Sequence, residues 1–207
     1  MYAYPAKFPV EVLDVIADHP NVCKYLDMPI QHVSDNVLKS MRRGISHRAL
    51  RQLIERVRSR VPDIALRTTL IVGYPAETER EFGELLDFVK EVRFDRLGVF
   101  EYSREEGTSA FDLADPIPQK EKERRKSAIM ELQQTISMER NEQLINTTQR
   151  VLLEREEEGM YVGRTERDAP EIDNEVFVRS SRPIPLGQFV DVDIEDASEY
   201  DLFGSVH

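Results

Sequence analysis

Polar side chains recur in this sequence where apolar, strand-like runs end. Three such runs are Val22–Met28, Thr68–Val72 and Leu97–Ser103. In parallel α/β architectures, the carboxyl ends of the strands meet at one edge of the sheet, where ligands bind. We therefore expect one binding site at this edge, built from the polar residues of several strands. The candidates are Gln31, His32, Arg67, Thr69, Glu77, Glu101 and Tyr102.

The run that ends at Val72 is followed at once by a turn and a helix start. Gly73 begins the turn, and Thr78 with Glu81 three residues later is the signature of a capped helix. We expect Gly73 to let another group approach the backbone and Glu77 to meet that group. The alternative is a tight strand-to-helix loop with a charged residue at the helix start.

His32 and Arg67 each allow two interpretations. His32 either belongs to the site or lies on the surface or at a helix cap. Arg67 stands in an otherwise apolar run, where a buried charge is costly unless it is paired. It therefore either pairs with a carboxylate such as Glu101 or binds an anionic ligand. The sequence has no nucleophile beside a base and no metal-ligand spacing, so it assigns no catalytic residue and no metal ligand.

Composition limits the class of protein. The 207 residues are 40% hydrophobic, which suits globular cores, and no apolar run is long enough to cross a bilayer. The N-terminus lacks a signal-peptide pattern, so we expect a cytoplasmic protein with no membrane partner. The only cysteine is Cys23, which excludes a disulfide within the chain and cannot alone hold zinc or an iron-sulfur cluster.

The net charge of −11 is unevenly distributed along the chain. Residues 150–207 contain six arginines and no lysine against fifteen acidic residues, a net charge of −9. Such a segment repels phosphate backbones and attracts basic partners. The alternative is that these charges simply solvate a small domain.

The order of the elements predicts two architectures in one chain. Strand-like and helix-like segments alternate to about Phe111, which is typical of an α/β fold with a parallel sheet or barrel. A long charged helix is expected from Gln119 to about Gln149, with most of its charges on a solvated face. Beyond it, a period of two predicts a small five-stranded antiparallel β-barrel. The expected domains are residues 1–118, a linking helix 119–148, and residues 149–207.

Three sequence blocks, in order and spacing, resemble the radical S-adenosylmethionine (SAM) methylthiotransferases. They are YLDMPIQHVSDNVLKSMRRG from Tyr25, RTTLIVGYPAETEREF from Arg67 and VFEYSREEGTSAF from Val99. The C-terminal segment is similar to the TRAM domain of that family. Within it, DAPEID from Asp168 and DASEYDLFG from Asp196 resemble the branch that modifies a ribosomal protein.

This resemblance implies the C-terminal portion of a (β/α)6 partial barrel followed by a TRAM, OB-like barrel. It implies a transferase that uses SAM and two four-iron four-sulfur clusters to add a methylthio group to an aspartate of small-subunit ribosomal protein S twelve. The expected partner is that basic protein, and direct nucleic-acid binding by the acidic TRAM segment is not expected. By matching motifs, the cofactor-binding residues would be Gln31, His32, Arg67, Gly73, Glu77, Tyr102 and Ser103.

The sequence departs from the family pattern in two ways. Ala76 stands where the family usually has glycine, and the CxxxCxxC motif that binds the radical-generating cluster is absent. We therefore expect a fragment that begins inside the third barrel strand, with Met1–Pro5 as a strand end, and that is inactive alone. The alternatives are a fragment of a tRNA adenosine methylthiotransferase and a non-catalytic module that binds a basic protein.

Overall fold

The structure is a computed structural model that describes residues 3–108 and 110–206. The chain forms two compact units. The first contains the residues up to Gln133, apart from the short segment Cys23–Tyr25, and the second contains the residues from Gln134. Met1 and Tyr2, the first two residues of the strand end expected over Met1–Pro5, lie outside the described residues. The expectation was wrong for the rest, because Ala3 and Tyr4 are not part of a strand and Pro5 begins a 3-10 turn. Ala3 donates its backbone N–H to the carbonyl of Asp27 at 2.8 Å.

The first unit is built on a three-stranded sheet in the order β1-β2-β3. Its strands are β1 (Tyr25–Asp27), β2 (Ala65–Val72) and β3 (Arg96–Glu101). β2 and β3 are parallel, as the alternation of strands and helices predicted. β1 is shorter than the expected strand Val22–Met28. The segment after β1 nevertheless runs alongside β2, since Gln31 forms a parallel bridge with Leu70.

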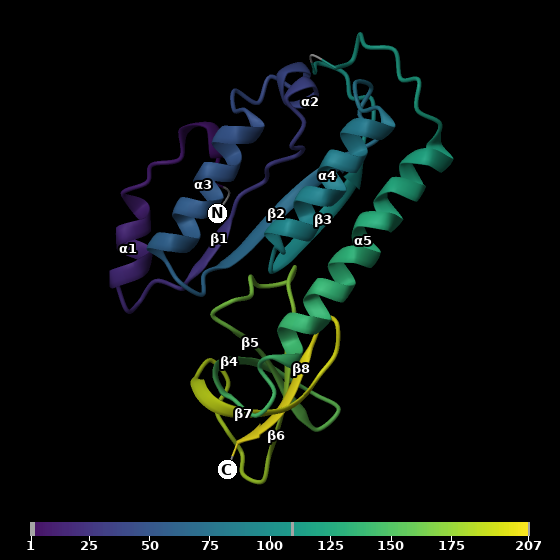
Figure 1. Cartoon of the computed structure of the whole chain (residues 1–207). Coiled ribbons are helices and arrows are strands. Elements are labelled where there is room, and N and C mark those ends of the chain that lie inside the picture. Colours follow the sequence, from purple (N-terminus) through teal and green to yellow (C-terminus); the bar gives the residue numbers. More distant parts are fainter. Residues whose placement is uncertain (1–2, 109, 207) are drawn as a thin grey trace. The chain divides into compact units, whose positions relative to one another are not determined.

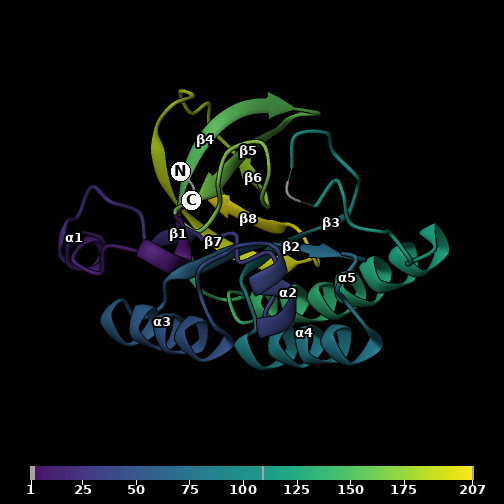
Figure 2. The ribbon, with the colours of Figure 1, turned by 90° about the horizontal axis from the view of Figure 1, so that it is seen from above.

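The larger helices cover one side of this sheet. The helical segments, in chain order, are the 3-10 turn η1 (Pro5–Lys7), α1 (Val12–Asp18), α2 (Asp35–Ser40), α3 (His47–Arg60), α4 (Glu79–Val92) and α5 (Gln119–Glu142). Figure 2 shows α3, α4 and the first part of α5 on the same side of β2. Alternation along β2 buries Leu70 and Val72 under these helices, whereas Thr69 and Ile71 face the open side of the sheet. The open side is therefore free to carry a site.

Two local predictions about the helices can be compared with the structure. Thr78 and Glu81 form the reciprocal capping box at the start of α4, as the sequence indicated. The long helix α5 ends at Glu142, seven residues before the predicted end at Gln149. None of the helices in the described part of the chain is both long and apolar enough to cross a membrane.

The second unit contains a closed five-stranded barrel. Its strands are β4 (Thr148–Glu157), β5 (Met160–Thr165), β6 (Val176–Ser180), β7 (Phe189–Ala197) and β8 (Leu202–Val206), in the order β4-β5-β6-β8-β7 (Figure 1). β6 and β8 are parallel, so the prediction of a fully antiparallel barrel was wrong for this pair. β7 pairs antiparallel with β4 on one side and with β8 on the other. β8 then lies beside β6 and runs in the same direction as β6. Periodicity predicts strands but not this order.

The barrel interior is completely filled. A cluster of seven buried aliphatic residues forms its core: Val151, Leu153, Val176, Val178, Val192, Ile194 and Leu202. Two glycines mark close strand approaches. A Cβ on Gly163 would lie 2.2 Å from the carbonyl oxygen of Leu152, and one on Gly204 would lie 2.3 Å from that of Asp193. Neither position has room for a side chain.

Candidate functional site

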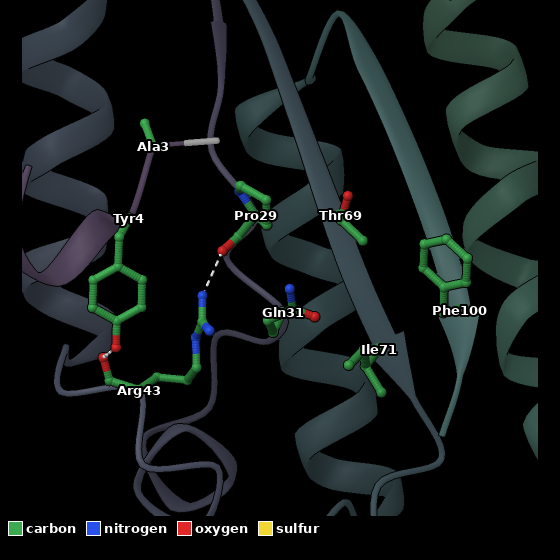
Figure 3. A pocket seen from close by; sticks show the side chains of 8 residues that line it. All are labelled: Ala3, Tyr4, Pro29, Gln31, Arg43, Thr69, Ile71 and Phe100. Carbon is green, nitrogen blue, oxygen red and sulfur yellow. Dashed lines mark hydrogen bonds between the residues drawn. The ribbon is translucent and has the colours of Figure 1, made fainter. Parts of the chain in front are cut away.

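A cavity of about 460 Å³ lies on the open face of the three-stranded sheet. Figure 3 shows its side chains coming from the segment after β1, from β2 and β3, and from the N-terminal residues. The lining residues are Ala3, Tyr4, Pro29, Gln31, Arg43, Thr69, Ile71 and Phe100. Among these residues, Phe100 is a large apolar side chain left 63% exposed.

Gln31 is held at the cavity by an unusual backbone conformation. Its φ is +68°, a left-handed value that is uncommon for a residue other than glycine. The backbone N–H of Gln31 donates to Thr69 O at 2.9 Å, and its carbonyl accepts from Ile71 N at 2.8 Å. Its buried side-chain oxygen Oε1 has no hydrogen-bond partner among the described residues. A strained residue with an unsatisfied polar atom in a cavity is typical of a ligand contact.

Arg43 forms one wall of the cavity. Its Nη2 donates to Pro29 O at 2.8 Å, and its guanidinium lies over the Tyr4 ring, 4.8 Å from the centroid. The Tyr4 hydroxyl donates to the Arg43 carbonyl at 2.5 Å (Figure 3). Burial holds the pKa of the Arg43 guanidinium below its ordinary value, against the opposing effect of Tyr4. The sequence reasoning missed both residues, because only the fold brings them together.

A buried polar network lies at the carboxyl ends of the strands. Glu77 is 2% exposed. Its Oε2 accepts from Gly73 N at 3.0 Å, and its Oε1 accepts from Arg125 Nη1 at 2.7 Å. His32 Nε2 lies 3.5 Å from Glu77 Oε2, and His32 Nδ1 accepts from Ser34 N at 3.0 Å. Since Nδ1 is an acceptor, the ring proton of neutral His32 lies on Nε2, facing the carboxylate.

Lys122 of α5 is the group that approaches the Gly73 backbone. A Cβ on Gly73 would lie 2.3 Å from Lys122 Cγ, and φ at Gly73 is +74°, so glycine is required on both counts. Lys122 Nζ donates to Tyr102 O at 3.1 Å and to Asp115 Oδ2 at 2.5 Å. The close approach inferred from the sequence is therefore made by a side chain of this chain. Burial raises the pKa of the Tyr102 hydroxyl, which donates to Ala110 O.

Arg67 pairs with a different carboxylate from the one suggested by the sequence. Its Nη1 lies 3.1 Å from Asp27 Oδ2, and both side chains are largely buried. Glu101 instead accepts from Gln119 and Lys126 of α5. The suggested pairing with Glu101 was wrong because the register of β3 places Arg96, not Glu101, beside Arg67.

The predicted site residues thus divide into three groups. Gln31 lines the cavity; His32, Gly73, Glu77 and Tyr102 meet in the buried network; Arg67 forms an ion pair on β2. Ser103 lies on an exposed segment, where its hydroxyl donates to Glu105 at 2.6 Å. No interaction with a ligand has been tested for any of them, so their roles in cofactor binding stay predictions.

The network also includes residues that the sequence reasoning assigned to a solvated face. Lys122 and Arg125 are each only 5% exposed, although most other charges of α5 do face solvent. Hydrogen bonds to Glu121 and Glu77 outweigh the effect of burial and hold the pKa of Arg125 above its ordinary value. A weak signal was present, because these two residues lie three apart and therefore on one face of the helix.

Comparisons with known proteins agree with this architecture. Residues 4–89 match the radical SAM superfamily, and residues 145–206 match the TRAM domain. The ribosomal protein uS12 methylthiotransferase RimO of Cytophaga hutchinsonii is 52% identical over 206 residues, which are 99% of this chain and 47% of that protein. The protein of the same name from Chloroherpeton thalassium is 51% identical over 210 residues, covering 100% and 48%. The chain therefore carries a radical SAM segment and a TRAM domain, and along its whole length it is similar to these methylthiotransferases.

The chain spans about half the length of the curated relatives it matches. A solved structure, coproporphyrinogen III oxidase (HemN) from Escherichia coli, described as a radical SAM enzyme, has a similar fold. Its TM-score is 0.51 at 22% identity, covering 68% of this chain and 32% of that one. The likeness supports the radical SAM fold class.

The residues of this chain do not fit an iron-sulfur cluster. The single cysteine, Cys23, is exposed, and no group of three or more His, Cys, Asp or Glu side chains in the described part of the chain could hold a metal ion. The cavity, by contrast, fits a polar organic ligand. It combines an unsatisfied amide oxygen, the Thr69 hydroxyl and an aromatic wall.

Proposed function

We propose that this chain is the substrate-facing part of a methylthiotransferase that modifies an aspartate of ribosomal protein uS12 in the cytoplasm. The observation that carries the proposal is about 50% identity, along the whole chain, to proteins named ribosomal protein uS12 methylthiotransferase. In this proposal the activity belongs to the longer protein, since no set of side chains in the part of the chain that the structure describes can ligate a cluster.

The cavity on the sheet is the proposed binding place of SAM, which supplies the radical chemistry when it is bound in the full protein. In this proposal, the Gln31 amide and the Thr69 hydroxyl contact the cofactor, and Phe100 and Ile71 provide an apolar surface for it. The buried network does not contact the cofactor in this proposal and acts only through the backbone. By fixing the turn at Gly73, it keeps the carboxyl end of β2 in place beside the cavity.

The charge of the barrel unit favours a basic protein over tRNA as the substrate. Its net charge of −9 opposes the approach of a phosphate backbone, and salt screens this repulsion only over about 8 Å. A basic ribosomal protein is attracted by the same charge. A tRNA adenosine methylthiotransferase is therefore the second candidate, and a non-catalytic module that binds a basic protein is the third.

A chimaera tests the proposed function. In the Cytophaga hutchinsonii relative, this chain replaces the residues to which it aligns, and the product is purified with its clusters reconstituted. We expect SAM-dependent addition of a methylthio group to uS12, detected by mass spectrometry of its peptides, and no modification of tRNA. A folded, cluster-loaded chimaera that modifies tRNA instead, or neither substrate, would contradict the proposal.

The 207-residue chain alone should be inactive. After anaerobic reconstitution with iron and sulfide, we expect no visible absorption band of a cluster and no cleavage of SAM, because the ligands are missing. A bound cluster together with cleavage would show that ligands come from outside the family pattern and would overturn this account.

A further inference from the structure

Two phenylalanines form an aromatic platform on the outside of the barrel. Phe177 of β6 and Phe203 of β8 are paired in register, and their rings stack with centroids 5.4 Å apart at 16°. Their neighbours along each strand, Val176, Val178 and Leu202, point into the core, so the two rings point outward. Phe203 is 36% exposed. The stacked pair therefore presents an apolar surface that a partner can cover.

Carboxylates lie along one side of this platform. β8 lies between β6 and β7 (Figure 1), and β7 carries the acidic residues Asp191, Asp193, Glu195 and Asp196. Asp196 is exposed and is directly opposite Phe203 in the β7–β8 register. Its Oδ1 accepts the N–H of Ala197, and no other hydrogen bond or ion pair of its side chain occurs among the described residues. A ring and an available carboxylate thus lie side by side.

The charge decides between two ligands that an aromatic platform can bind. Exposed aromatic residues on OB-like barrels serve as stacking surfaces for nucleic-acid bases. Here the same face is acidic, and a phosphate backbone would be repelled from it. An arginine side chain meets both conditions, because its guanidinium stacks on a ring and binds a carboxylate at the same time. A lysine ammonium can also lie over a ring, but it has no planar group that stacks on the ring while its N–H groups bind the carboxylate.

The barrel already contains one arginine that pairs with a carboxylate and another that lies over an aromatic ring. Arg179 of β6 pairs with Glu195, which also accepts from the Ser205 hydroxyl at 2.6 Å. At another place on the barrel, the guanidinium of Arg150 lies over the Phe189 ring, 4.6 Å from the centroid. Asp196 and Phe203 offer the same two groups without an arginine of the chain itself.

We propose that the outer face of β6, β8 and β7 is an arginine-binding surface, at which Phe203 stacks on, and Asp196 pairs with, an arginine of a basic protein partner. This inference rests on the proposed function, since it specifies how the barrel unit holds a basic substrate. It assigns recognition to a single type of side chain and not to general attraction by the −9 charge.

Peptide binding to the full 207-residue chain tests the proposal. Three peptides of identical length, containing two arginines, two lysines or two citrullines, are titrated by fluorescence anisotropy, together with a single-stranded RNA oligonucleotide. We expect the arginine peptide to bind best. Phe203→Ser should weaken its binding about two- to fivefold, the range of an exposed cation–π contact, and weaken the binding of the lysine peptide less.

Two matched aspartate variants separate the proposed site from bulk charge. Asp196→Asn and Asp191→Asn remove the same charge from the same strand, and both residues are exposed. We expect Asp196→Asn to weaken arginine-peptide binding about two- to fivefold and Asp191→Asn to weaken it less than twofold. Circular dichroism confirms that each variant is folded, and Asp196→Asn tests the site even if Phe203→Ser does not fold.

The results distinguish this inference from the proposed function. Equal effects of the two aspartate variants, or RNA binding that Phe203→Ser weakens, would overturn the arginine-binding surface. Methylthiolation of uS12 by the chimaera would then still stand. Conversely, arginine-specific binding at Phe203 with no modification of uS12 would uphold the surface and reject the substrate.

Discussion

Replacing Arg125 by methionine should destabilise the first unit strongly. Arg125 Nη1 and Glu77 Oε1 are 2.7 Å apart, and their side chains are 6% and 0% exposed. Removing one partner of a buried ion pair costs about 3–5 kcal/mol, because the other charge is left buried. Glu77 keeps the Gly73 N–H, so the lower end, about 3 kcal/mol, is expected. This is a large fraction of the total stability of a typical domain.

The adjacent residue provides a matched control. Arg124 also lies over the Phe82 ring, at 5.3 Å against 5.4 Å for Arg125, so the cation–π contact is lost in both variants. Arg124 is 49% exposed and pairs with surface carboxylates, including Glu79. Arg124→Met should therefore cost less than about 1 kcal/mol. The difference between the two variants isolates the effect of burial.

Hydrogen exchange read by mass spectrometry is the assay, because it follows peptides of β2 and α4 separately from the barrel unit. A second readout is urea unfolding, in which a loss of about 3 kcal/mol lowers the midpoint by roughly 1–3 M. In the double variant Glu77→Gln/Arg125→Met, part of the loss should be recovered, since no buried charge is left without a partner. Equal losses in Arg125→Met and Arg124→Met would refute the buried network as a source of stability.

Two further predictions concern the same region. Gly73→Ala should destabilise the first unit by more than about 1 kcal/mol in urea unfolding, because the added Cβ would meet Lys122 and the φ at this position is positive. Gly83→Ala in α4 is the control. An added Cβ there has open space around it, so this variant should be neutral or stabilising by up to about 1 kcal/mol. Hydrogen bonds from Arg124 are the largest cause that lowers the pKa of Glu121 from 4.5 to about 2. The contribution of ionised Glu121 to the free energy of unfolding is therefore fully present above pH 4.5 and is lost as the pH falls toward 2. Between these pH values, the stability of Glu121→Gln should fall less than that of the unsubstituted chain in urea unfolding. Equal losses of stability in the two proteins would contradict this prediction.

Local signals in the sequence predicted much of the first unit. The capping box at Thr78 and Glu81 and the turn at Gly73 depend on neighbouring residues, and both occur as expected. The parallel alternation of strands and helices also follows from local patterns, since each hydrophobic period identifies one element. These features need no knowledge of distant contacts.

The partners of the charged residues could not be predicted in the same way. Arg67 pairs with Asp27, forty positions away, and Glu77 pairs with Arg125, forty-eight positions away. Both pairs depend on strand order and on where α5 packs, which periodicity does not determine. The parallel pairing of β6 and β8 was missed for the same reason. The cavity residue Arg43 was read only as a charge at the end of a helix.

The solid interior of the barrel unit limits how its specificity can change. Gly163 and Gly204 leave no space for a Cβ, and aliphatic side chains fill the remaining volume. Hollowing the barrel into a pocket for a small molecule by truncating a core aliphatic side chain would cost about 2–5 kcal/mol, a large part of the stability of a typical domain. Exchanging residues of the outer faces is a less costly way to change what such a barrel binds, so a few surface substitutions could convert a protein-binding barrel into an RNA-binding one.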